Sequence, residues 1–223
     1  MRIICLGPPG IGKGTQAKQM QQRLGVPHID TGEIFREHAV KGTPLGLKGK
    51  SYTDRGDLVP DQLVTEVVME RLRAVDCVRG FLLDGFPRTI PQCEALDTFL
   101  FGIGLSIDIV VEYTAPIELI IQRLSGRRVC RQCGRNFHTV FKPSVAGQNC
   151  DCCGGTLFQR QDDMPEAIKQ RLVVFEKQTL GVASFYGKRG ALVTLSGAGT
   201  VEEVFARTTD ALNKIGRDKV QVS

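Results

Sequence analysis

Short apolar runs alternate along the chain with longer segments in which apolar residues recur at helical spacing, and this alternation predicts strands and helices in turn. The predicted strands are Arg2–Leu6, Pro27–Ile29, Gly80–Leu83, Ile107–Tyr113 and Ala191–Leu195. The predicted helices are Gly14–Leu24, Gly32–Lys41, Asp61–Arg73, Pro116–Leu124, Pro165–Tyr186 and Val201–Ile215. Apolar strands that alternate with helices form parallel sheets covered on both faces, so the pattern predicts a three-layer α/β fold with a central parallel five-stranded sheet.

Two stretches depart from this alternation and predict insertions. Residues 126–163, here called the cysteine module, are rich in cysteine and glycine and contain short β-prone pieces such as Phe137–Phe141, which indicates a small β-rich unit. Residues 30–59 are helical with glycine turns. We therefore expect one domain over residues 1–223, with a core made of 1–29, 60–125 and 164–223.

Four of the eight cysteines form two matched pairs, Cys130 with Cys133 and Cys150 with Cys153. Each pair has two residues between its thiols and a glycine directly after it, and sixteen residues separate Cys133 from Cys150. This spacing is typical of four thiolates around a structural zinc ion. Such a site leaves no open position for a substrate, so the metal is expected to stabilise the cysteine module rather than to catalyse.

Other ligands and metals remain open at this point. Cys152 and His138 are alternative ligands, and iron or cobalt could occupy the same thiolates. A module of this size buries little apolar surface, so we expect loss of the metal to lower its stability and the thermal midpoint.

The first predicted strand runs directly into a glycine-rich segment that ends in a lysine and opens a helix. The segment reads Gly7-Pro8-Pro9-Gly10-Ile11-Gly12-Lys13-Gly14-Thr15. Glycines let backbone N–H groups turn toward phosphate oxygens, the helix start adds partial positive charge, and the lysine adds a full one. The general phosphate-loop (P-loop) pattern has Ser or Thr directly after the lysine, whereas here Gly14 intervenes before Thr15. We expect this loop to bind a nucleoside triphosphate. The displaced hydroxyl of Thr15 suggests that the metal ion bound with the triphosphate depends less on a loop hydroxyl than in the general pattern.

The bulk composition narrows the class of protein. With 42% hydrophobic and 24% charged residues, the 223-residue chain resembles ordinary soluble globular proteins. No apolar run approaches the ~20 residues of a membrane helix, and the N-terminal run is too short for a signal peptide, so we expect a cytoplasmic location. The net charge of +5 comes from scattered arginines rather than basic blocks, which favours small polyanions over nucleic acid as partners.

Four further stretches, taken with the phosphate loop, closely resemble the adenylate kinase family in its bacterial long form with a zinc-bearing lid. They are Asp30–Arg36, Gly80–Thr89, Gly126–Val129, and Arg160–Asp163 with Arg171 beyond. The resemblance covers essentially the whole chain in the right order. It implies the reaction ATP + AMP ⇌ 2 ADP with Mg²⁺, an AMP-binding insertion at 30–59, and a lid over ATP at 126–163. No covalent nucleophile is needed for such a transfer, and no serine–histidine–aspartate arrangement stands out.

The resemblance also implies roles for individual residues. Around ATP it places Gly10, Ile11, Gly12, Lys13, Gly14, Thr15, Arg127, Asn136, Phe137 and Gly199. Around AMP it places Thr31, Arg36, Asp57, Leu58, Val59, Gly85, Phe86, Pro87, Arg88, Gln92, Arg160 and Arg171, with Gln92 as a reader of adenine. The catalytic groups it implies are Lys13, Arg88, Arg123, Arg127, Arg160 and Arg171, with Asp84 holding magnesium through water.

Three positions depart from the family pattern. Asp30 stands where a small residue is usual, so its carboxylate should point away from the anion site or pair with an arginine. Glu33 replaces a more usual Asp, and Ser196 replaces a common Asp near the C-terminal nucleotide loop. These departures concern nucleoside contacts rather than the type of reaction.

Two alternative functions are set against this one. The first is a kinase for another nucleoside monophosphate, GMP or UMP and CMP, which an assay with varied acceptors would identify. The second is a zinc-ribbon nucleic-acid binder with an ATPase core, against which the chain lacks a basic and aromatic stripe. The resemblance further suggests a monomer.

Overall fold

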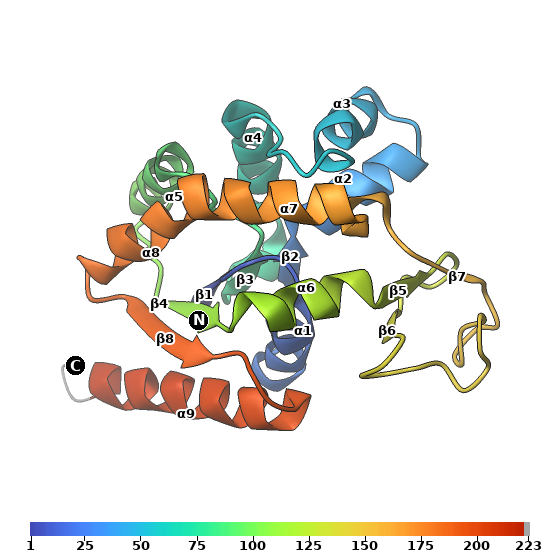
Figure 1. The fold of residues 1–223 in the computed structure, drawn as a ribbon. Helices are drawn as coiled ribbons and strands as arrows, with labels where there is room; N and C mark the ends of the chain where they lie inside the picture. Colours follow the sequence, from blue (N-terminus) through green and yellow to red (C-terminus); the bar gives the residue numbers. More distant parts are fainter. Residues whose placement is uncertain (221–223) are drawn as a thin grey trace.

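In the computed structural model, which describes residues 1–220 with side chains as far as residue 214, five parallel strands form the central sheet (Figure 1). They are β1 (Arg2–Leu6), β2 (His28–Asp30), β3 (Phe81–Asp84), β4 (Ile109–Thr114) and β8 (Leu192–Ser196), in the order β2-β3-β1-β4-β8. All four pairings are parallel. The predicted fold class and all five predicted strands are confirmed.

Nine α-helices accompany these strands within the described residues. They are α1 (Lys13–Leu24), α2 (Thr31–Val40), α3 (Pro44–Thr53), α4 (Asp61–Leu72), α5 (Ile90–Gly102), α6 (Ile117–Ser125), α7 (Pro165–Val174), α8 (Leu180–Gly187) and α9 (Val201–Val220). The sequence prediction missed α5, and it treated 165–186 as one regular helix. In the structure a π-helical segment, Phe175–Thr179, joins α7 to α8.

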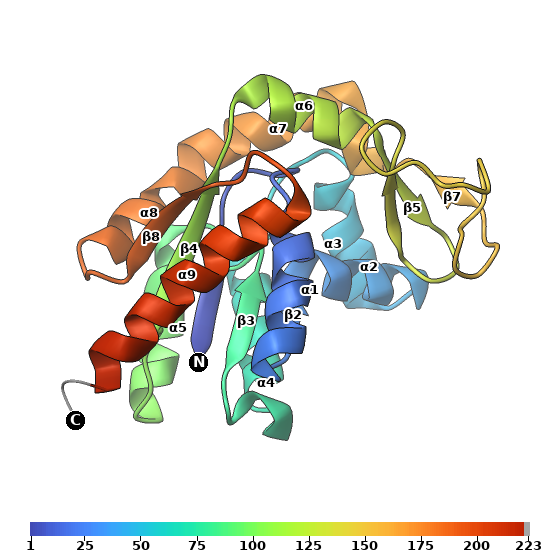
Figure 2. The ribbon, with the colours of Figure 1, turned by 90° about the horizontal axis from the view of Figure 1, so that it is seen from below.

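The alternation of side chains along each strand feeds two apolar layers. Ile4 and Leu6 of β1 point into a cluster with side chains of α4, α5 and α8. Ile3 and Cys5 point the other way, into a cluster with side chains of α1, α6 and α9. Figure 2 shows α9 and α1 along one side of the sheet and α5 on the other. Both faces of β1 are thus buried, as expected for a central parallel strand.

The cysteine module forms a separate antiparallel sheet. Its strands are β5 (Arg127–Cys130), β6 (Asn136–His138) and β7 (Leu157–Phe158), in the order β6-β5-β7. Its apolar cluster consists of Cys130, Phe137 and Cys150, with Leu157 packed against them, and Val129 of β5 is also buried. In Figures 1 and 2 this sheet and the helices α2 and α3 lie at the same end of the molecule. The prediction of a small β-rich unit is confirmed.

The strand order positions a crevice at the carboxyl ends of β1 and β3. The chain leaves β1 toward α1 on one face and leaves β3 toward α5 on the other. Loops that diverge from adjacent parallel strands in this way open the crevice in which ligands of such sheets bind. The phosphate loop and the Asp84–Arg88 segment are the two loops at this point.

Candidate active site

The phosphate loop connects β1 to α1 in a conformation that depends on glycine. Gly10 and Gly12 have φ values of 79° and 107°, which other residues rarely adopt. Gly12 precedes α1, and no side chain caps the helix start. The first backbone N–H groups of α1 are therefore available to an anion, and the helix dipole favours one there.

Lys13, the first residue of α1, folds its side chain back over this loop. Its Nζ donates hydrogen bonds to the carbonyl oxygens of Gly7 at 2.8 Å and Pro8 at 2.9 Å. Burial lowers the pKa of Lys13 to about 8, with Arg88 and Arg171 acting in the same direction and Asp84 opposing them. An ammonium group in such surroundings is stabilised by any added phosphate.

Asp84 ends β3 beside the phosphate loop. It is 6% exposed, its Oδ2 lies 3.5 Å from His28 Nε2, and Cβ of a residue replacing Gly14 would lie 3.3 Å from that oxygen. Burial acts to raise the pKa of Asp84. His28 and Lys13 together more than offset this effect, so the pKa lies below its usual value. The result is a fixed carboxylate beside the loop, which suits a water-bridged magnesium ion.

Two arginines from different elements share one buried aspartate. Arg127 of β5 donates from Nε to Asp163 Oδ2 at 2.6 Å, and Arg171 of α7 donates to Asp163 Oδ1 at 3.1 Å. Asp163 is fully buried, and Arg171 also contacts Asp162 at 3.0 Å. Burial acts to lower the pKa of Arg127, but Asp163 more than offsets it and raises that pKa. These carboxylates hold both guanidinium groups in place.

The remaining arginines of the crevice carry mutual repulsion. Burial lowers the pKa of Arg160 to about 10, and Arg36 and Arg127 lower it further. Burial likewise lowers the pKa of Arg88, with Arg36 adding to it and Asp84 and Asp30 opposing it. The cations predicted to surround the phosphates are thus close enough to affect one another, and an anion among them would relieve the repulsion.

Asp30 pairs with an arginine, as its unusual position led us to expect. Its Oδ2 lies 3.7 Å from Arg36, and its Oδ1 accepts from the backbone N–H of Glu33 at 3.0 Å, which caps α2. The Glu33 side chain is exposed. The Asp30 carboxylate is thus shared between an ion pair with Arg36 and the cap of α2.

Arg123 of α6 ties the phosphate loop to the loop after β8. One of its terminal nitrogens donates to the carbonyl oxygens of Ile11 at 2.9 Å and Gly197 at 3.0 Å, and the other reaches Gly199 at 3.4 Å. The Ser196 hydroxyl accepts from the N–H of Ala198 at 3.3 Å. In this arrangement Arg123 holds the backbone of the two loops together. Burial lowers the pKa of Arg123.

The residues predicted for AMP lie where α2, β3 and α5 meet. The Thr31 hydroxyl donates to the Gly85 carbonyl at 3.0 Å, and Arg88 Nε donates to the same oxygen at 2.8 Å. A Cβ at Gly85 would lie 2.7 Å from Thr31 Oγ1 and 3.0 Å from Arg88, so glycine is needed there. Gln92, in the first turn of α5, is buried, and so are Phe86 and Pro87 in the segment before this helix.

A cleft of about 350 Å³ separates the segment before α4 from α7. Its lining includes Asp57, Leu58 and Val59, the three predicted for backbone contact with AMP, together with Asp61. Asp57 Oδ1 accepts from Gln170 of α7 at 2.9 Å, which joins the two walls.

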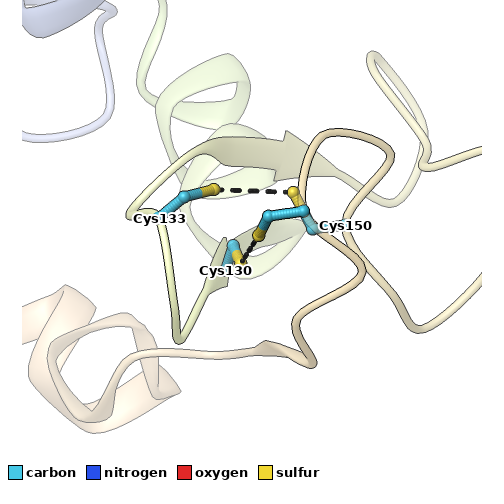
Figure 3. A group of neighbouring side chains, drawn as sticks. Cys130, Cys133 and Cys150 are labelled. Atoms are coloured by element: carbon cyan, nitrogen blue, oxygen red, sulfur yellow. Dashed lines mark hydrogen bonds between the residues drawn. The ribbon is translucent and has the colours of Figure 1, made fainter.

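Four cysteine sulfurs converge in the cysteine module (Figure 3). The Sγ atoms of Cys130, Cys133, Cys150 and Cys153 all lie within 4.8 Å of one another. Backbone N–H groups of Gln132 and Cys152 donate to Cys130 and Cys150, each at 3.4 Å. Hydrogen bonds from backbone N–H groups lower the pKa of Cys130 to about 6. A tetrahedral metal fits this donor set.

The two alternative ligands lie outside this cluster. Cys152 is exposed and contributes its backbone N–H rather than its thiol. His138 Nε2 faces the Gln122 carbonyl at 3.1 Å, while Nδ1 accepts from the N–H groups of Val140 and Phe141 at 3.0 Å. Both ring nitrogens of His138 are therefore occupied by protein groups.

The remaining predicted ATP contacts have different exposures. Asn136 and Thr15 are exposed, whereas the Phe137 side chain is 5% exposed and packs on the cysteine cluster.

Sequence reasoning did not assign roles to Asp162, Asp163, His28 or Asp61. Asp162 and Asp163 follow Arg160 in the quoted run, and adjacent acids between arginines are a signal that could have identified them. Nothing in the sequence indicates that Asp61 contacts α5 or that His28 contacts Asp84.

Comparison with known proteins places the chain among described families. The family model described as adenylate kinase matches residues 5–191. A protein of Carboxydothermus hydrogenoformans named adenylate kinase is 50% identical over 96% of this chain and 100% of its own length. Proteins of the same name from Methanocella arvoryzae and Caldicellulosiruptor saccharolyticus are 50% and 49% identical, over 96% and 97% of this chain and 100% and 99% of their own. No helix within the described residues is long and apolar enough to cross a membrane.

Proposed function

Because the chain belongs to the adenylate kinase family and is a phosphotransferase that catalyses ATP + AMP ⇌ 2 ADP, we propose a division of its residues between the two nucleotides. The phosphate loop, residues 10–15, holds the ATP phosphates through backbone N–H groups and Lys13. The 30–59 insertion and the Gly85–Gln92 segment hold AMP. The crevice between them, at the carboxyl ends of β1 and β3, is where the phosphoryl group moves.

The observation that carries this proposal is the group of cations gathered at that crevice from several elements. Arg88 after β3 and Arg171 of α7 both lower the pKa of Lys13 of α1, and Arg88 also lowers the pKa of Arg171. Two polyanions repel each other, and fixed cations offset this repulsion while holding the phosphates in line. The arrangement supplies positioning and charge rather than a covalent nucleophile, which fits direct phosphoryl transfer.

Within this crevice Asp84 is the residue suited to hold Mg²⁺ through water. When bound with ATP, Mg²⁺ neutralises phosphate charge. Asp84 is buried beside Gly14 and its pKa lies below the usual value, so it stays a carboxylate.

For the cysteine module we propose a structural zinc ion on Cys130, Cys133, Cys150 and Cys153. The support is the convergence of four sulfurs and the backbone N–H groups aimed at two of them. Metal analysis of purified protein tests this: one zinc per chain is expected, and iron or cobalt in its place would change the metal but not the ligands.

We further propose that the cysteine module acts as a lid that closes over ATP and that 30–59 closes over AMP. Closure excludes water, which would otherwise accept the phosphoryl group. The enzyme is expected to work as a cytoplasmic monomer without nucleic acid, which sedimentation and fractionation would test.

Acceptor assays test the choice of AMP. ADP formation from Mg-ATP is measured with AMP, GMP, UMP and CMP in turn, and strong transfer to AMP alone is expected. Preference for another acceptor would overturn the base assignment while keeping the mechanism.

Substitution of Arg160 tests the cation cluster. Among the described residues Arg160 has no ion pair within 4.0 Å, so its removal leaves the Arg127 and Arg171 pairs in place. Arg160→Ala is expected to lower kcat by about 10²–10³-fold. The matched control is Arg79→Ala, an exposed arginine far from the crevice. Equal activity of both variants would overturn the role of Arg160.

A further inference from the structure

The side-chain amide of Gln92 is held at both of its ends. Its Oε1 accepts from the backbone N–H of Arg88 at 2.7 Å, and its Nε2 donates to Asp61 Oδ1 at 2.6 Å. Gln92 is 2% exposed, so these contacts are shielded from solvent. Asp61 is the first residue of α4 and lies 31 positions earlier in the chain.

Asp61 is itself held in place from a second direction. Its Oδ2 accepts from the Thr89 hydroxyl at 2.8 Å, and Thr89 caps α5 by accepting from the Gln92 N–H at 3.4 Å. One carboxylate therefore joins the start of α4 to the start of α5. It also borders the cleft lined by Leu58 and Val59.

The chemistry of these partners allows only one orientation of the amide. A backbone N–H can only donate a hydrogen bond, and a carboxylate can only accept one. Rotating the Gln92 amide by half a turn would set its NH₂ group against the Arg88 N–H and its oxygen against Asp61. Each lost bond leaves a buried polar group unsatisfied, which disfavours the rotated amide.

The amide in this orientation keeps one N–H and one oxygen lone pair unused. Adenine offers an amino donor and a ring-nitrogen acceptor side by side, which match that remaining pair. Hypoxanthine and guanine have the opposite pattern, a carbonyl acceptor beside an N–H donor, and would require the rotated amide. The fixed orientation thus carries a preference for adenine.

We propose that Asp61 is a positioning residue that sets base specificity by locking the Gln92 amide in its adenine-reading orientation. The inference rests on the proposed role of Gln92 as the reader of AMP. The Arg88 N–H is backbone and stays with any substitution. Asp61 is the side chain through which the lock can be weakened.

The decisive variant is Asp61→Asn, assayed with AMP and IMP as acceptors. Asparagine keeps the size of the side chain but can either accept or donate, so position 61 no longer disfavours the rotated amide of Gln92. IMP is the sharpest probe because its base differs from adenine only at the edge that Gln92 would read. The ratio of kcat/KM for AMP to that for IMP is expected to fall on the order of tenfold, with the gain on IMP appearing in KM.

Two further variants separate positioning from general damage. Asp61→Glu keeps an accept-only group and should keep the ratio close to that of the parent enzyme, even if both rates fall. Asp97→Asn makes the same carboxylate-to-amide change on α5, where Asp97 contacts Tyr186 and Arg189, and should leave the ratio unchanged. A ratio that falls equally in all three variants would overturn the proposal.

Gln92→Met distinguishes failure of this inference from failure of the reader role. If Gln92→Met lowers the ratio and Asp61→Asn does not, Gln92 reads the base but Asp61 does not position it. If Gln92→Met leaves the ratio unchanged, the reader role itself fails and the inference with it.

Discussion

The main sheet and the cysteine module are stabilised by different means. Every strand face of β1 is buried in one of two large apolar clusters that reach the helices on both sides. The apolar cluster of the module has three buried residues, and two of them are cysteines. The thiol of Cys130 faces that of Cys153, and the thiol of Cys150 faces that of Cys133. The free energy gained from apolar burial is roughly proportional to the area buried. The central sheet is therefore amply stabilised by burial, and the module gains little from it. We therefore expect the module, unlike the main sheet, to depend on the proposed metal for its shape.

Removal of the metal is expected to have the largest effect and to be confined to the module. Chelation, or Cys150→Ser, should raise amide exchange rates across β5 to β7 by about 10²-fold or more, while exchange in β1 and β4 changes little. Hydrogen exchange with mass spectrometry measures both regions at once. Cys152→Ser is the matched control, because that thiol lies outside the cluster. Uniform loss of protection across the chain would show that the two regions are not independent.

A cavity in the main core should destabilise the central sheet and leave the metal of the module in place. Leu96 of α5 is fully buried, so Leu96→Ala is expected to lower the free energy of unfolding by about 2–5 kcal/mol. The thermal midpoint should fall by about 2–4 °C for each kcal/mol, with metal content unchanged.

Phe101→Ala on the same helix is the control for this substitution. Its side chain is 85% exposed, and calorimetry should give nearly the parent midpoint. A loss of bound metal in Leu96→Ala would mean that the module depends on the core more than its contacts indicate.

The pH dependence of ATP binding gives a smaller effect that belongs to the main sheet alone. The pKa of Lys13 is lowered from 10.5 to about 8 in the free protein, chiefly by burial, and phosphates would raise it again. Binding above pH 8 then takes up a proton, so ATP affinity should fall by up to about tenfold per pH unit. Titration calorimetry in buffers of different ionisation enthalpy measures that uptake. Lys13→Met should bind more weakly and without this dependence; the same slope in that variant would assign it to another group.

The stability of the free protein should change in the other direction over the same range. The pKa of Lys13 is 10.5 in the unfolded chain and about 8 in the folded chain, so the folded chain loses this proton at a lower pH. Unfolding therefore takes up a proton between these values, and the contribution of Lys13 to stability rises with pH across this window. Lys13→Met removes this contribution in denaturant titrations.

The smallest predicted effect lies at the boundary of the two regions. A Cβ at Gly126 would overlap the His138 ring, so Gly126→Ala must displace the ring from Gln122. We expect a loss of about 1 kcal/mol, with faster exchange at the Val140 and Phe141 amides that His138 accepts from. Gly102→Ala is the control, since nothing lies within 4 Å of its Cβ position. Unchanged exchange at both amides would mean that His138 does not order this turn.

The features that sequence predicts well here are local or depend on spacing. The strands follow from short apolar runs. The grouping of four cysteines follows from their paired spacing, and their sulfurs do converge in the structure. The helix α5 was missed because apolar residues such as Phe101 and Leu100 lie all round it rather than along one face. Periodicity has little to detect in such a helix.

The contacts that the sequence could not predict join residues far apart in the chain. Asp61 meets Gln92, Arg127 meets Asp163, and His28 approaches Asp84 only because the fold brings their elements together. No local pattern specifies which acid will lie beside which base. The chemical type of the site was thus predictable from the order of its motifs, while its internal hydrogen bonding required the three-dimensional arrangement.

The full burial of Asp163 has a mechanical consequence. One carboxylate holds Arg127 at the start of the small sheet and Arg171 on a helix of the core. Separating a desolvated ion pair leaves an uncompensated charge, which is far more costly than bending a backbone. If the small sheet swings as proposed above, we expect it to turn about Asp163 as a pivot, with Arg127 and Arg171 both still paired to that carboxylate.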